Sequence, residues 1–101
     1  MSRKDRIEAA LRVLVPVHLE VVNESHMHSV APGSETHFKV VVVSSAFEGQ
    51  ALLARHRRIN DLLAAELAAG LHALSIHAFS PAQWSSVVDT QSPACRGGAG
   101  K

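Results

Sequence analysis

One stretch of this 101-residue chain, residues 37–79, limits its possible folds more than any other. Residues 37–44, HFKVVVVS, alternate in the pattern of a strand. Residues 51–68 repeat apolar side chains at spacings of three and four, which predicts the longest helix, and Gly70 ends it. Residues 71–79, LHALSIHAF, alternate again. A helix of this length between two strands predicts a right-handed crossover, with the two strands parallel in one sheet.

Three more elements complete the predicted order of helix, strand, strand, helix, strand, helix. Residues 2–14 carry apolar side chains at helical spacing behind a capping Ser2, and residues 17–22 alternate as another strand. Ser80 and Pro81 open a short final helix. We therefore predict an α+β fold, a two-layer sandwich in which helices cover one face of a three-stranded mixed sheet and the other face stays partly open.

Composition predicts one soluble domain with a short tail. Apolar residues make up 47% of the chain and charged residues 19%, which is the balance of a globular domain with one core. Residues 1–88 form the predicted domain, whereas residues 89–101 are small, polar and rich in glycine and predict a flexible tail. The amino-terminal stretch MSRKDRIEAALRVLV holds charges and no long apolar run, so we expect neither a secretory signal nor a membrane span.

Charge, cysteine content and missing motifs narrow the possible functions. The formal net charge of +1 gives no overall attraction to nucleic acid or to an anionic membrane. The single cysteine, Cys95, excludes an internal disulfide and predicts a reducing compartment, the cytoplasm, or the mitochondrion if the chain is eukaryotic. The sequence has no nucleophile elbow, phosphate loop, dinucleotide fingerprint or H-E-x-x-H motif, so we predict no enzymatic activity.

Three histidines are candidate metal ligands. His26 and His28 lie in ESHMHSVAPGSET, a connection of 13 residues, and connections of that length are more often functional than short ones. In a locally extended chain both rings project the same way, which suits a metal, although loop histidines are commonly only solvated. His72 starts the third strand on its apolar side, where the alternative to a ligand is a core-edge histidine bonded to a backbone carbonyl. The residue pattern alone leaves these alternatives open.

A dense basic run lies within the predicted long helix, at Arg55, His56, Arg57 and Arg58. Successive helical residues are about 100° apart, so Arg55 and Arg58 share one flank and Arg57 lies on another. Three phosphate contacts would give a salt slope of only about −2.7. The run therefore indicates either a solvated helix surface or a weak, salt-sensitive contact with nucleic acid.

Three strings of the sequence resemble the BolA family: ESHMHSVAPGSETHFKVVVVS, FEGQALLARHRRINDLLAAEL and HALSIHAFSPAQW. The resemblance runs from about residue 3 to SPACRGG in the tail, and the combination of G-S-E-T-H-F, F-x-G-x5-R-H-R and H-A-L is highly specific. It implies an α-β-β-α-β-α fold like a class II KH domain, in agreement with the order above. We find no G-x-x-G loop of the type that clamps nucleotides, so the fold alone does not imply nucleic-acid binding.

The resemblance implies a partnership with a monothiol glutaredoxin, in a heterodimer that shares a bridging two-iron two-sulfur (2Fe-2S) cluster. That role belongs to iron-sulfur cluster maturation or trafficking and to iron or redox regulation. The implied main ligand is the H of H-A-L, His72, and the implied loop ligand falls on His28, with His26 as the alternate. We expect the isolated chain to bind no cofactor and to be a monomer or a weak homodimer.

A shared cluster agrees with the donor atoms that this chain offers. The cluster needs four ligands, commonly thiolates, and imidazoles can replace two of them on one iron. One cysteine cannot supply a thiolate set, so a partner must supply the sulfur. The resemblance implies that the glutaredoxin thiolate and bound glutathione do so, and that this chain contributes two imidazoles. As the alternative, the resemblance implies a DNA-binding transcriptional regulator of morphology and stress genes that uses the helix 51–68, with Arg55, Arg57 and Arg58.

Overall fold

The computed structural model describes residues 2–25 and 34–90, and the elements within them follow the predicted order. The helices and strands are α1 (Arg3–Leu11), β1 (His18–Asn23), β2 (His37–Val43), α2 (Leu52–Leu62), α3 (Ala64–Ala68), β3 (Ala73–Phe79) and α4 (Pro81–Thr90), with short 3-10 helices η1 (Arg12–Leu14) and η3 (Ser45–Phe47). Of the predicted tail, residues 89–101, Asp89 and Thr90 lie in α4 and residues 91–101 lie outside the described residues, so the flexible tail stays a prediction. Across the part of the chain that is described, no helix is both long and apolar enough to cross a bilayer.

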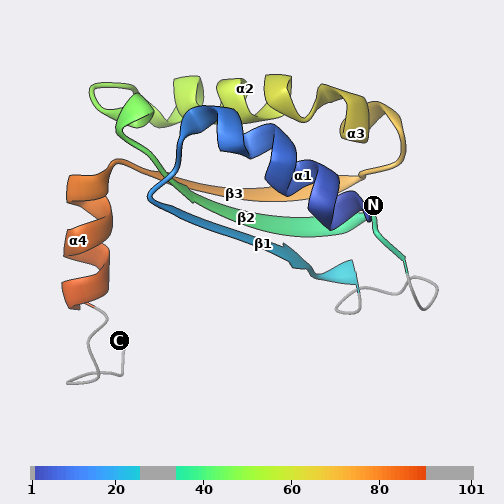
Figure 1. Ribbon diagram of the computed structural model, residues 1–101, viewed down its shortest axis with the longest axis horizontal. Coiled ribbons are helices and arrows are strands. Elements are labelled where there is room, and N and C mark those ends of the chain that lie inside the picture. The colour runs from blue at the N-terminus through green and yellow to red at the C-terminus, as the bar shows by residue number, and fades with distance from the viewer. Residues whose placement is uncertain (1, 26–33, 91–101) are drawn as a thin grey trace.

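The sheet is mixed and has the strand order β1-β2-β3 (Figure 1). β1 runs antiparallel to β2, with Val21 opposite Val40, and β3 runs parallel to β2, with Ile76 beside Val40. The predicted parallel crossover is therefore confirmed. Because β2 is the central strand, Val41 and Val43 on its second face are buried as well, which accounts for its unbroken run of valines.

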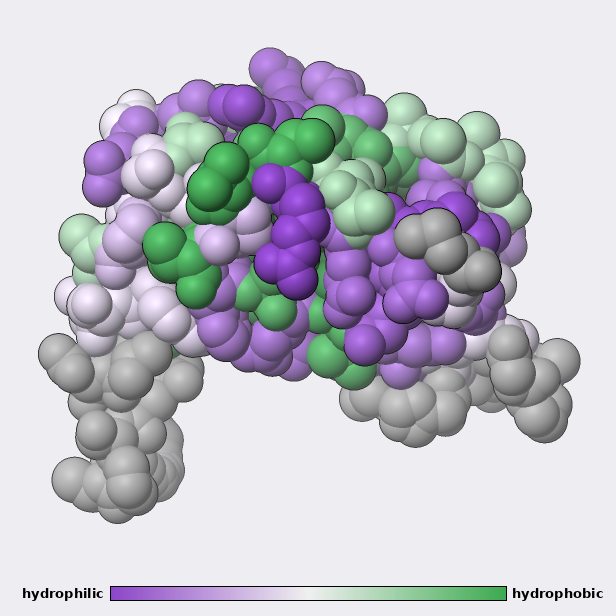
Figure 2. Space-filling view, viewed as in Figure 1, coloured by the Kyte–Doolittle hydropathy of each residue, from purple (hydrophilic) through white to green (hydrophobic). Residues whose placement is uncertain are grey.

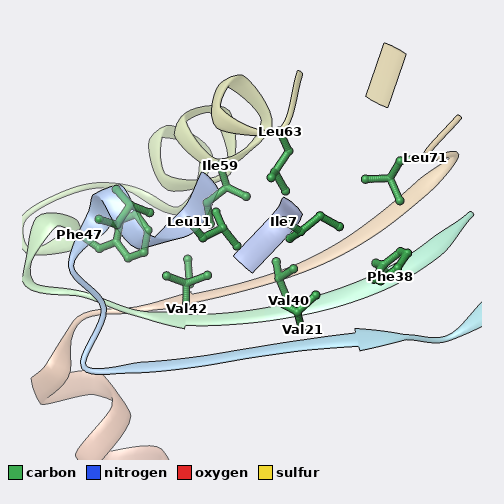
Figure 3. Packing of buried hydrophobic residues seen from close by; sticks show 12 residues of the cluster. Ile7, Leu11, Val21, Phe38, Val40, Val42, Phe47, Ile59, Leu63 and Leu71 are labelled. Atoms are coloured by element: carbon green, nitrogen blue, oxygen red, sulfur yellow. The ribbon is translucent and has the colours of Figure 1, made fainter. Parts of the chain in front are cut away.

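The core lies between the sheet and the layer formed by α1, α2 and α3 (Figures 1 and 3). None of its labelled side chains is more than 4% exposed: Ile7, Leu11, Val21, Phe38, Val40, Val42, Phe47, Ile59, Leu63 and Leu71. The strand alternation and the helical spacing assign most of these side chains to inner faces, and that assignment is confirmed. Each large side chain buried in this way contributes about 1.5–3 kcal/mol.

Helix α1 begins at the predicted cap. The Ser2 hydroxyl accepts a hydrogen bond from the Asp5 N–H at 3.2 Å, and the Asp5 carboxylate accepts one from the Ser2 N–H at 3.2 Å. These bonds, the one from the Ser2 backbone first, hold the pKa of Asp5 below its usual value. The capping box fixes the start of α1, so that Ile7 and Leu11 face the core.

The predicted helix over residues 51–68 is divided into α2 and α3 at Leu63. Leu63 has φ −103° and ψ 14°, outside the helical region, although its N–H still donates to the Ile59 carbonyl and its carbonyl still accepts from the Leu67 N–H, both at 3.0 Å. The axis is thus distorted rather than broken. The Leu63 side chain is 1% exposed, so packing of this residue in the core accompanies the distortion.

Helix α4 does not join the helical layer. It lies at the end of the sheet where β2 and β3 finish (Figure 1). Its Trp84 stacks on His18 at 4.8 Å between ring centroids and lies 5.4 Å from the ring of Phe79. His18, Val43 and Phe79 are neighbours in the strand register and face away from the core, so Trp84 covers one end of the otherwise open face.

Exposed apolar side chains gather around the turn between α1 and β1 and at the start of α2. Figure 2 shows the green surface over the first of these regions. The exposed fractions are 63% for Val13, 80% for Val15 and 70% for Val17. Val15 also has a φ of 49°, a left-handed conformation that is unusual for a β-branched residue.

Candidate functional site

His72 lies immediately before β3, and its side chain is exposed. The Thr36 carbonyl accepts hydrogen bonds from the His72 N–H at 2.9 Å and from the Ala73 N–H at 3.0 Å, which fixes the backbone on both sides of the imidazole. Within residues 2–25 and 34–90 the ring itself has no hydrogen-bond partner. This exposure does not fit the alternative of a histidine buried at the edge of the core. No described residue occupies a ring nitrogen of His72, so either nitrogen is available to a ligand as far as the described part of the chain is concerned.

Two residues before the 26–33 segment and two after it are joined by hydrogen bonds in a structure that we call the neck: Asn23, Ser25, Ser34 and Thr36. Ser25 is 3% exposed, and its hydroxyl accepts from the Thr36 N–H and the His37 N–H, both at 3.0 Å. The Asn23 side chain accepts from the Ser25 N–H and donates to the Ser34 carbonyl, both at 2.9 Å. The neck therefore joins the end of β1 to the start of β2, beside His72.

His26 and His28 fall within residues 26–33 and lie outside the described residues, so their roles stay predictions. The chain re-enters the described part at Ser34, two residues before the carbonyl that holds His72. The segment that carries both predicted loop ligands therefore starts and ends at the neck. Thr36 is the residue that connects the neck to His72.

The sequence analysis gave the neck residues no role. Asn and Ser at the end of a strand are residue types that bond the backbone through their side chains, and this was the available signal. A further imidazole also lies here, because His37 Nδ1 is 2.8 Å from Thr36 Oγ1 and His37 is beside Ala73 in the register. The end of the sheet that carries His72 is thus built from polar side chains.

An ion-paired cluster supports the same end of the sheet. Arg3 donates to the Glu66 carboxylate at 2.9 Å, to the Ala69 carbonyl at 2.9 Å and to the Glu35 carbonyl. Arg6 donates to the other Glu66 oxygen at 2.7 Å. The hydrogen bonds from Arg6 and then Arg3 hold the pKa of Glu66 below its usual value. Arg3 thereby ties α1 both to α3 and to the residue that precedes Thr36.

The three arginines of the basic run do not share one surface. Arg55 is only 5% exposed, and it donates to the Gln50 and Ala78 carbonyls at 3.0 Å and to the Gln83 side chain at 2.6 Å. Arg57 and Arg58 are exposed. The helical geometry that placed Arg55 and Arg58 on one flank did not reveal that Arg55 turns inward. Its guanidinium joins α2 to β3 and α4.

Among the described residues, no group of three or more His, Cys, Asp and Glu side chains is placed to hold a metal ion. His72 is thus a candidate single donor next to the neck.

The sequence is similar to that of known proteins over most of its length. A family model described as BolA-like protein matches residues 10–83. The DNA-binding transcriptional regulator BolA of Escherichia coli (strain K12) is 49% identical over 100 residues, covering 96% of this chain and 95% of that protein. BolA-like protein 1 of Pongo abelii is 56% identical over 99 residues, covering 91% of this chain and 72% of that protein.

The solved structures show the same relationship. The BolA domain of SufE1 from Arabidopsis thaliana is 50% identical, has a TM-score of 0.76 and covers 82% of this chain and 96% of its own. None of these three relatives carries the name of an enzyme. The family model covers most of the chain, and the identities extend over nearly its full length. The chain belongs to the BolA-like protein family.

Proposed function

We propose that this protein is a non-enzymatic adaptor that binds a monothiol glutaredoxin and shares a bridging 2Fe-2S cluster with it. His72 is the main ligand, His28 the loop ligand, and His26 the alternate. The adaptor acts in iron-sulfur cluster maturation or trafficking and in iron or redox regulation. The observation that carries the proposal is the exposed imidazole of His72 on a backbone held by the Thr36 carbonyl.

The donor chemistry fits such a cluster. A neutral imidazole can replace a thiolate on one iron of a 2Fe-2S centre, and the exposed His72 ring breaks no hydrogen bond to a described residue when it binds a ligand. A residue three positions after Ser25 cannot be more than about 11 Å from it, Cα to Cα, because of the length of the chain. His28 is therefore always tethered near the neck, in which Ser25 is bonded to Thr36, the residue that holds the His72 backbone.

The remaining donors come from the partner. The only cysteine of the chain, Cys95, lies outside the described residues, and one cysteine cannot complete four ligands. The active-site thiolate of a monothiol glutaredoxin and the thiolate of bound glutathione supply the sulfur. The bound cluster supplies transferable iron and sulfide, while this chain orients His72. Because a protonated imidazole cannot bind iron, cluster sharing weakens on acidification.

The test is reconstitution of the complex from the purified full chain, a monothiol glutaredoxin, glutathione, iron and sulfide. His72→Ala should change the visible charge-transfer spectrum and shorten the cluster lifetime by at least about tenfold. His77→Ala is the matched control, because His77 is an exposed histidine of β3, the strand that follows His72, and its Nε2 lies 3.2 Å from the Ser75 hydroxyl. A wild-type spectrum and lifetime in His72→Ala would refute the ligand assignment. Separate His28→Ala and His26→Ala variants decide which loop histidine is used.

A second candidate function is DNA-binding transcriptional regulation. The relative from Escherichia coli is named as a DNA-binding transcriptional regulator, and Arg57 and Arg58 are exposed on α2. Arg55 would act here by holding α2 in place, since its guanidinium already binds two carbonyls. Two phosphate contacts correspond to a salt slope of about −1.8. This surface predicts weak, salt-dependent binding.

The DNA candidate is tested by fluorescence anisotropy with a labelled duplex across a series of salt concentrations. The double variant Arg57→Ala/Arg58→Ala should weaken binding and remove most of that slope. The control Lys4→Ala/Arg12→Ala removes the same charge from exposed residues of α1 and η1. Equal losses in the two double variants would indicate a charge effect without a defined contact on α2.

A further inference from the structure

We infer that Ser25 is a positioning residue for His72. Its hydroxyl closes the neck and thereby fixes Thr36, the residue whose carbonyl holds the His72 backbone. The effect on a bound cluster rests on the function proposed above. The effect on the backbone at His72 can be measured without a cluster.

The Ser25 hydroxyl bonds to two backbone groups at the start of β2. This single oxygen accepts from two consecutive N–H groups, those of Thr36 and His37, in a residue that is 3% exposed. The Glu24 N–H donates to the His37 carbonyl at 2.7 Å, and a regular antiparallel rung would return the His37 N–H to the Glu24 carbonyl. Here the His37 N–H donates to the Ser25 side chain. The Ser25 hydroxyl thus takes the place of the Glu24 carbonyl as the acceptor of the His37 N–H in this rung.

Hydrogen bonds then lead from Thr36 to His72. The N–H of Thr36 is held by Ser25, while its carbonyl accepts from the N–H groups of both His72 and Ala73. Thr36 is therefore bonded to β1 on one side and to the start of β3 on the other. A shift of Thr36 away from Ser25 would move the acceptor that orients the His72 backbone.

Ser44 allows a positioning effect of Ser25 on His72 to be told apart from a contribution to the stability of the whole fold. Ser44 is a matched residue at the opposite end of the sheet, 0% exposed, whose hydroxyl donates to the Leu14 carbonyl at 2.6 Å and accepts from the Ala46 N–H at 3.1 Å. Ser44→Ala removes the same atom from an equally buried bridging serine, but far from His72 along β2. If Ser25 acts only through global stability, the two alanine variants should behave alike at His72.

The experiment combines amide hydrogen exchange on the full chain with the cluster lifetime in the reconstituted glutaredoxin complex. Ser25→Ala should raise exchange at Thr36, His37, His72 and Ala73 by about tenfold, because the neck opens more often. It should also shorten the cluster lifetime by about tenfold. Ser25→Thr keeps the hydroxyl and should restore both readouts. Ser44→Ala should leave the exchange at His72 and the cluster lifetime at wild-type values.

The outcomes distinguish the inference from the proposed function. Unchanged exchange at His72 and Ala73 in Ser25→Ala overturns the inference. So does a wild-type cluster lifetime in Ser25→Ala when His72→Ala shortens it, and in that case the proposed function stands. If His72→Ala itself leaves the cluster unchanged, the proposed function fails and the positioning role fails with it. An equal change in Ser44→Ala would reduce Ser25 to a general contributor to stability and reject the inference.

Discussion

At the end of the sheet where β2 and β3 finish, which we call the Trp84 end, Ser44 bridges two backbone groups, Trp84 covers His18, and Arg55 donates to the Ala78 carbonyl. At the other end, the neck end, Ser25 likewise bridges two backbone groups, but His72 beside it is exposed. The two ends thus use similar buried polar side chains. They differ in what is left at the surface.

This difference separates polar residues that hold the fold together from those available to a partner. The Arg55 guanidinium donates to three acceptors within the protein, in addition to lying 5.9 Å from the centre of the Phe47 ring. The His72 ring has no such partner among the described residues, although its backbone is firmly bonded. A side chain that is fixed at its backbone and free at its tip is suited to binding. One that is satisfied at its tip is suited to packing.

The largest effect is expected at the Trp84 end. Arg55→Ala leaves two carbonyls and the Gln83 side chain without their donor, and it should lower the free energy of unfolding by about 2–4 kcal/mol. Urea denaturation at pH 7 measures this loss. Arg57→Ala, which removes an exposed arginine of the same helix, should stay within about 0.5 kcal/mol of wild type. Similar losses in both variants would contradict the interior role of Arg55.

Glycines with positive φ offer a matched pair, one at each end. Gly70 has φ +121° and precedes His72, while Gly49 has φ +77° and follows η3. Alanine at either position should cost about 1–2 kcal/mol because of the backbone conformation; the space is sufficient, since the nearest atom to a new Cβ at Gly70 is 3.5 Å away. Amide exchange at His72 should rise in Gly70→Ala only. A rise in Gly49→Ala as well would show that the ends are not independent.

A stabilising substitution is expected at Val15. Its left-handed φ of 49° is unfavourable for valine and tolerated by asparagine, and at 80% exposure the side chain contributes little packing. Val15→Asn should therefore raise the free energy of unfolding by about 0.5–1 kcal/mol, measured by urea denaturation. Val17→Asn provides the comparison, because Val17 is 70% exposed without a positive φ. The same gain in both variants would show that it comes from replacing an exposed apolar side chain with a polar one, and not from the backbone conformation of Val15.

The smallest effect is a pH dependence of the neck end. Glu66 has a lowered pKa in the folded state, so its contribution to stability is complete above its unfolded-state pKa of about 4.3 and is lost as the pH falls through the folded value. The difference in stability between wild type and Glu66→Gln should therefore shrink on acidification below about pH 4.3. Urea midpoints between about pH 7 and pH 3 measure it. A difference that stays constant with pH would show that the ion pairs with Arg3 and Arg6 contribute nothing.

The element order and the inner faces were predictable because they follow from local periodicity. Phe38, Val40 and Val42 alternate, and Ile7 and Leu11 are four residues apart, so each set faces the core whatever the rest of the chain does. The crossover rule then supplied the parallel pairing of β2 and β3. These predictions needed no knowledge of long-range contacts.

The remaining features depend on contacts between distant segments. Arg55 is buried because the outer edge of β3 presents the Ala78 carbonyl to α2, which helical spacing does not reveal. Trp84 leaves the helical layer because the row of His18 and Phe79 offers it an aromatic surface. The exposure of His72 follows from its position one residue before β3, where the alternation of the strand no longer decides the direction of the side chain.

The position of Arg3 has a practical consequence for handling the protein. Arg3 is the first residue of α1, and its side chain donates hydrogen bonds to the Glu35 and Ala69 carbonyls and to the Glu66 carboxylate. The amino-terminal end of α1 is therefore bonded to the segments that lead to Thr36 and to His72. Trimming three residues from the amino terminus, or proteolytic nicking there, would loosen a region far away in sequence. Affinity tags and fusion partners placed directly before Ser2 can therefore change the position of the His72 backbone, even though no residue near His72 has been substituted.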